Sequence, residues 1–161
     1  MNTTAKKVVN GLAAALRTRF GRTADVTVHV APDPARAVEL LAGGKPGGFA
    51  VVVFYGGDDP DAGGAEVYGD TSVRARLSVG VSSHPGLSAQ GSREAPDVLA
   101  FADKVRAAVL AADVPDLLGG IDYAGMSYAS ASDGTLLHGY ALEFRATYAF
   151  ELDETNDQPA N

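Results

Sequence analysis

The segment at 140–152, YALEFRATYAFEL, limits the fold of this chain more than any other stretch does. Its apolar positions are Tyr140, Leu142, Phe144, Ala146, Tyr148, Phe150 and Leu152, and other side chains fill the positions between them. Successive side chains of a β-strand point to opposite faces of a sheet. The alternation therefore predicts a half-buried strand that is longer than most strands in globular proteins.

A second segment, SVRARLSVGVS at 72–82, alternates in the same way. Apolar side chains occupy every second position, and Arg74 and Arg76 occupy two of the positions between them. Glu143 and Arg145 hold equivalent positions in the final strand. Two strands of this kind predict a sheet with one apolar face packed on helices and one exposed face that carries these four charged side chains.

Three further segments predict strands. DVTVHVA at 25–31 alternates, whereas FAVVVFY at 49–55 is apolar throughout. A short, continuous apolar run rich in β-branched residues is typical of a central strand that is covered on both faces. A weaker strand follows Gly119 and Gly120, at 121–130. The chain thus supplies about five strands.

Three segments predict amphipathic helices. At 3–20, apolar side chains recur every four residues. The helix PARAVELLA at 34–42 follows Asp33, a residue type that caps helix N-termini, and it has proline at its first position. Pro96 opens a third helix, PDVLAFADKVRAAVLAA, whose apolar side chains share one face.

This order of elements predicts the fold class. Helices and strands in this order favour an α+β fold. The expected architecture is a mixed, mostly antiparallel sheet of about five strands, with the helices packed on one face. We expect a single α+β domain at 1–152. The remaining segment, DETNDQPAN at 153–161, is polar and predicts a flexible C-terminal tail.

A glycine-rich stretch with a lysine, GGKPGGFAVVVFYGG at 43–57, raises the question of phosphate binding. A phosphate loop of the Walker type needs a Ser or Thr after the lysine, and it lies between a strand and a following helix. Here Pro46 follows Lys45, a predicted helix precedes the loop, and a predicted strand follows it. The stretch therefore predicts a connector and not a nucleotide site.

The sequence also predicts no metal site and no cofactor. His29, His84 and His138 lie on a predicted strand, a loop and a turn, without the spacing of metal ligands. Asp59 and Asp61 resemble part of a calcium loop, but the distal glutamate of such a loop is missing.

Other functional classes are disfavoured as well. Ser127 stands in GMSYA, yet a nucleophilic serine of the elbow type needs a helix directly after it, and here a turn and a strand are predicted. No pair of side chains forms a convincing general acid and base, so we expect no enzyme. The net charge of −7 disfavours specific DNA or RNA binding. The uncharged stretches are too short for a membrane span.

The charged residues are the remaining candidates for function. Arg74 and Arg76 either contact a subunit or partner, or they pair across strands with Glu143 or Glu151. Both alternatives stay open. The candidate interface residues are Arg74, Arg76, Glu143, Arg145, Asp58, Asp59 and Asp61, the last three of which belong to a polar, glycine-rich segment expected to be a loop at 56–70.

The order of elements is also similar to that of a known family. An amphipathic helix, a strand-to-helix step marked by proline, a long loop, the strand VRARLSVGV, a helix and the strand YALEFRATYAFEL follow one another. In this arrangement, roughly residues 3–152 resemble the tail terminator family of tailed phages, also called tail completion or minor tail proteins. The resemblance implies a mixed sheet with helices on one side and a hexameric ring that caps the tail tube, stops its growth and joins it to the head.

The resemblance implies partners as well. The implied partners are further copies of the chain, the tail tube protein and the head–tail connector protein. DNA would pass through the ring without specific binding, and no membrane would be involved. The family has no cofactor and no catalytic residues, and its members are assembled in the host cytoplasm and end in the virion. Segments 56–70 and 83–94 would be the contact loops. The alternatives are a head-closure or neck connector protein and a small α+β ligand-binding regulatory domain.

Overall fold

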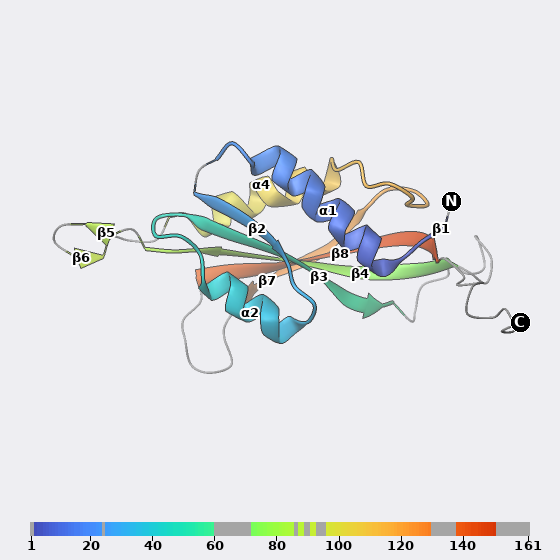
Figure 1. Ribbon diagram of the computed structural model, residues 1–161, viewed down its shortest axis with the longest axis horizontal. Coiled ribbons are helices and arrows are strands. Elements are labelled where there is room, and N and C mark those ends of the chain that lie inside the picture. The colour runs from blue at the N-terminus through green and yellow to red at the C-terminus, as the bar shows by residue number, and fades with distance from the viewer. Residues whose placement is uncertain are drawn as a thin grey trace, which may run out of the picture.

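One large mixed sheet and three helices dominate the part of the chain described by the computed structural model (Figure 1). The described residues are 2–23, 25–59, 72–85, 87–88, 91–92, 96–129 and 138–150. The strands of the large sheet are β1 (Asn2–Thr3), β2 (Val26–Val30), β3 (Phe49–Asp58), β4 (Ser72–Ser83), β7 (Asp122–Ala129) and β8 (His138–Phe150). The helices are α1 (Ala5–Phe20), α2 (Pro34–Ala42) and α4 (Val98–Leu110).

The strands lie in the order β1-β8-β4-β3-β2, and β7 pairs with the edge of β8 that faces away from β4. β4 runs antiparallel to both β3 and β8, and β7 runs antiparallel to β8. Among the described strands, only β2 with β3 and β1 with β8 are parallel. The α+β class and the mixed, mostly antiparallel sheet predicted from the sequence are therefore confirmed.

The two long alternating segments form the centre of this sheet. β4 and β8 pair without interruption from Ser72 beside Ala149 to Ser83 beside His138. In this register Leu77 lies beside Phe144, and both are fully buried on the apolar face. The charged positions of the two strands consequently share the opposite face of the sheet.

Helices α1 and α4 cover the apolar face (Figure 1). Leu12 and Leu16 of α1 and Val105 of α4 are completely buried against the central strands. The rings of Phe49 and Phe101 stack with their centroids 4.0 Å apart, which joins β3 to α4. Each fully buried leucine or valine contributes about 1.5–3 kcal/mol relative to an exposed one. This layer is therefore the main core of the protein.

Helix α2 lies on the other face of the sheet, so the expectation that all helices pack on one face is wrong (Figure 1). Leu41 of α2 packs with Ala50 and Val52 of β3, whereas the neighbouring Val51 and Val53 belong to the main core. The hydroxyl of Ser82 donates a hydrogen bond to the Leu41 carbonyl oxygen at 2.7 Å. β3 is thus covered on both faces, as its continuous apolar run predicts.

Two expected loops contain more regular structure than the sequence indicated. β3 continues to Asp58, because a register shift between Tyr55 and Gly57 keeps the strand paired with β4. Within 83–94, the short strands β5 (Leu87–Ser88) and β6 (Gly91–Ser92) pair as a hairpin. The predicted tail at 153–161 lies outside the described residues. Among the described residues, no helix combines the length and apolar character that crossing a bilayer requires.

Candidate interaction surfaces

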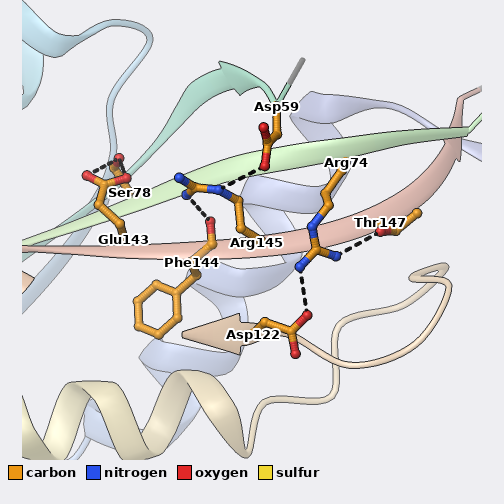
Figure 2. Close-up of polar contacts among 8 residues, drawn as sticks. All are labelled: Asp59, Arg74, Ser78, Asp122, Glu143, Phe144, Arg145 and Thr147. Atoms are coloured by element: carbon orange, nitrogen blue, oxygen red, sulfur yellow. Dashed lines mark hydrogen bonds and ion pairs between the residues drawn. The ribbon is translucent and has the colours of Figure 1, made fainter. Parts of the chain in front are cut away.

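Polar side chains of β4 and β8 share one surface of the sheet, and Figure 2 draws these residues except Arg76. We call this surface the charged face; it consists of Arg74, Arg76 and Ser78 from β4 and Glu143, Arg145 and Thr147 from β8. Helix α2 covers a different part of the same side of the sheet, beside Gly80 and Ser82. The alternating sequence thus placed four candidate interface residues, Arg74, Arg76, Glu143 and Arg145, on one surface.

Arg74 is engaged within the chain. Its guanidinium donates to a carboxylate oxygen of Asp122 at 2.8 Å and to the hydroxyl of Thr147 at 3.3 Å (Figure 2). Asp122 comes from β7, so this ion pair reaches across β8. Among the described residues, the hydrogen-bond partners of Arg74 are thus Asp122 and Thr147, and Glu143 is not one of them. Arg74 therefore pairs across strands with Asp122, and not with Glu143 as one alternative expected; Glu151 lies outside the described residues.

Arg145 and Arg76 lie directly opposite each other in the β4–β8 register. The Nε of Arg145 is 3.4 Å from Asp59, and another of its nitrogens donates to the Phe144 carbonyl oxygen at 3.0 Å. No described carboxylate forms an ion pair with Arg76, whose side chain is exposed. Two like charges on directly opposed positions destabilise a sheet. This point of the charged face therefore holds two arginines, of which Arg145 has Asp59 as its counter-ion and Arg76 has none among the described residues.

Ser78 and Glu143 form the next opposed pair along the two strands. The Ser78 hydroxyl lies 2.8 Å from both carboxylate oxygens of Glu143, to which it donates (Figure 2). Ser78 is buried, and Glu143 is partly buried. Glu143 thus has its own hydrogen-bond partner, and no ion pair joins it to Arg76 among the described residues.

An open groove of about 650 Å³ runs beside these residues. It crosses three strands, and it is lined by Pro34, Phe54, Tyr55, Gly56, Gly57, Arg76, Ser78, Glu143 and Arg145. Gly56 and Gly57 leave part of the wall without side chains, and Phe54 and Pro34 add an apolar end. The groove therefore holds two arginines and one glutamate beside a short apolar wall.

The acidic candidates do not form one cluster. The Tyr55 hydroxyl donates to a carboxylate oxygen of Asp58 and lies 3.4 Å from the Tyr148 hydroxyl. Burial, followed by these two hydrogen bonds, raises the pKa of Tyr55 far above its usual value. Asp59 instead pairs with Arg145. Asp61 lies outside the described residues. Asp58 thus bonds to a residue of its own strand, whereas Asp59, just after β3, contacts β8 through Arg145.

A second surface was not predicted from the sequence. Four of the five large apolar side chains exposed in the described residues lie on α4 or β7, which pack against each other. We call them the β7-edge patch: Leu99 and Leu110 at 45% exposure, Tyr123 at 39% and Tyr128 at 57%. The guanidinium of Arg106 lies 5.2 Å from the Tyr123 ring centroid and connects the helix to the strand. Leu99 and Leu110 lie outside the core-facing stripe of α4. Two leucines outside that stripe are the feature of the sequence that could have indicated this patch.

A shallow hollow lies between α1 and α4, with a volume of about 800 Å³. Alanines form most of its wall, and Arg19, Lys104, Thr18 and Asp113 are at its borders. Small side chains on both helices leave this space open. The hollow and the β7-edge patch therefore occupy different sides of α4.

The histidines do not form a metal site. No group of three or more metal-ligating side chains occurs among the described residues. The His84 ring nitrogen lies 3.2 Å from the Ser82 hydroxyl, and burial lowers the pKa of His84. Ser127 of β7 is followed by two further strand residues and not by a helix. We therefore find no arrangement of catalytic type in the described part of the chain.

Comparison of the chain with protein-family models and with curated protein sequences finds no match. Inference about its function consequently rests on the order of its elements, on the charged face with its groove, and on the β7-edge patch.

Proposed function

We propose that this chain is a structural protein of a tailed-phage virion, a tail terminator that forms a ring, caps the tail tube, stops its growth and joins the tail to the head connector. The support for a phage tail is the resemblance carried by the strands at 72–82 and 140–152. A mixed sheet with helices is compatible with that family, although α2 departs from the one-sided arrangement. The proposed role is structural and involves no catalysis.

The β7-edge patch is the observation that carries the proposal of self-assembly. Tyrosine, leucine and arginine side chains gather there on the outermost long strand and its helix. Aromatic residues and arginine are enriched in protein interfaces, and exposed apolar patches mark interaction sites. The patch therefore fits a contact with a neighbouring subunit.

A ring also needs a second, different surface on each subunit. Ring closure uses heterologous contacts, in which one patch meets another patch of the next copy. The hollow between α1 and α4 provides room for projecting side chains, and Arg19 and Lys104 at its border can lie against tyrosine rings. We assign this hollow as the counterpart of the β7-edge patch.

Sedimentation velocity of the purified chain tests this assignment. The double variant Leu99→Ser and Tyr128→Ser should weaken self-association by about ten-fold or more, since interface aromatic residues dominate binding energy. Val38→Ser on α2 is the matched control, because Val38 is similarly exposed, at 38%, and lies outside the patch. Equal association of the double variant and the wild type would remove the patch from the interface.

A second candidate function has its own observation. A pocket of about 480 Å³ lies between α1, β2 and β3, lined by Val9, Val30, Ala31, Pro32 and Tyr55, with Ala5, Lys6 and Asn10 completing its wall. An apolar pocket with a few polar groups is typical of ligand sites. A ligand-binding domain should gain thermal stability with a metabolite mixture, and Val9→Trp should abolish that gain. A head-closure protein would instead bind the connector and leave tail tubes unbound.

A further inference from the structure

The groove on the charged face holds two arginines, Arg76 and Arg145, that can bind a carboxylate, and its lining also includes the carboxylate of Glu143. Arg76 and Arg145 are directly opposed, so their positive charges repel each other unless an anion lies between them. Arg145 forms a 3.4 Å ion pair with Asp59 and donates to the Phe144 carbonyl oxygen, whereas no described carboxylate pairs with Arg76. Guanidinium groups bind carboxylates through paired, charge-assisted hydrogen bonds.

The shape of the groove favours an extended peptide over a compact ligand. The groove is open, so it cannot enclose most of the surface of a small molecule as ligand pockets do. Gly57 leaves space for an incoming main chain, because a Cβ there would meet nothing within 4 Å. Phe54 and Pro34 can contact one apolar side chain of the peptide.

The chain itself contains a segment with the complementary charge. Residues 151–157, ELDETND, follow β8 directly and carry Glu151, Asp153, Glu154 and Asp157. Leu152 supplies an apolar side chain within the same segment. Copies of a chain with net charge −7 repel one another in general, so a contact between them needs a local positive site.

The position of β8 and the length of the chain after it allow the segment to reach a second copy. Arg145 precedes Phe150 by five positions on the same strand, and a strand rises about 3.3 Å per residue, so β8 carries the chain about 17 Å away from the groove. Residues 151–161 can extend up to about 36 Å beyond that point, which is enough to reach an adjacent molecule.

We propose that the groove beside Arg76 and Arg145 binds the acidic segment 151–157 of a second copy of this chain. This inference rests on the self-assembly proposed above and adds a contact that is separate from the β7-edge patch. A tail that binds its neighbour would connect successive subunits of a ring, with each copy giving one acidic segment and receiving another.

Charge reversal on the full chain tests the contact by sedimentation velocity. Arg76→Glu alone and the pair Asp153→Lys with Glu154→Lys should each weaken self-association by about ten-fold, because each places like charges together. Combining all three changes should restore association to within about three-fold of the wild type, since the attraction is re-established with reversed signs. Arg22→Glu is the matched control, because Arg22 is an exposed arginine in the turn after α1, and it should change association less than two-fold.

A labelled peptide with the sequence of residues 151–161 provides a separate measurement. Its receptor is the full chain with Asp153→Lys and Glu154→Lys, whose own acidic segment no longer competes. Fluorescence anisotropy should show binding that Arg76→Glu weakens about ten-fold and Arg22→Glu leaves unchanged. Binding should also weaken as salt is added.

The outcomes separate this inference from the proposed function. Self-association that depends on Leu99 and Tyr128 but not on Arg76 or Asp153 would keep the ring and overturn the groove contact. If Arg76→Glu weakens association but Asp153→Lys with Glu154→Lys does not, the acidic segment is not the occupant of the groove. A monomeric wild type would contradict the ring. In that case, peptide binding that Arg76→Glu abolishes would still support recognition of the acidic segment by the groove. Absence of peptide binding would overturn the groove contact.

Discussion

His84 shows how a single residue depends on the packing of α2 against the sheet. Its ring lies against Gly44, where a side chain would overlap it, and its nitrogen lies 3.2 Å from the Ser82 hydroxyl. Burial lowers the pKa of His84, and the nearby His138 contributes in the same direction, while the hydrogen bond to Leu41 opposes them. The folded chain therefore favours the neutral ring.

The lowered pKa predicts a loss of stability in mild acid. Below about pH 6.5, the usual pKa of histidine, the unfolded chain takes up a proton at His84 more readily than the folded chain does. The free energy of unfolding should therefore fall as the pH drops from about 6.5 toward 5. His84→Asn should reduce this slope in denaturant titrations at several pH values. An identical slope in the variant would show that His84 does not cause the pH dependence.

At the scale of elements, the position of α2 was the feature that was predicted wrongly from the sequence. The stripe of Ala37 and Leu41 indicates a buried helix face, but it does not say which side of the sheet receives that face. The apolar run of β3 contained the missing information, since a strand buried on both faces needs a layer on each side. The strands themselves were predicted closely, because alternation and apolar runs are local patterns.

The close contact between α2 and β4 predicts a specific sensitivity. A Cβ at Gly80 would lie 2.7 Å from Cδ1 of Leu41. Gly80→Ala should therefore lower the free energy of unfolding by about 1–3 kcal/mol, the usual cost of overpacking. Gly120→Ala is the control, since a Cβ there meets nothing within 4 Å, and it should change stability by less than about 0.5 kcal/mol. Equal stability of both variants in urea titrations would argue against close packing at Gly80.

The candidate site was predictable only in part, for a related reason. Alternation placed Arg74, Arg76 and Arg145 on one face, because the period of a strand is local. The ion pair of Arg74 with Asp122 depends on β7 pairing with the far edge of β8, which no local pattern indicates. The β7-edge patch likewise requires α4 and β7 to be neighbours, so its tyrosines and leucines had no evident relation in the sequence.

For the whole molecule, the described surfaces lie on different sides of the fold. The β7-edge patch lies at one edge of the sheet, the hollow lies on the outer side of α1 and α4, and the charged face lies on the side of α2. Distinct surfaces of this kind allow one copy to contact a neighbour on each side and a further partner on another face. This arrangement is what the proposed ring on a tail tube needs.

The most direct measurement is electron microscopy of the purified chain, alone and mixed with tail tubes. The proposal predicts ring-shaped particles, or particles bound at the ends of the tubes, and tubes that stop elongating when the chain is added. The double variant of Leu99 and Tyr128 should abolish the rings, and Val38→Ser should retain them. A chain that remains monomeric both alone and in the presence of tail tubes would contradict the proposed function.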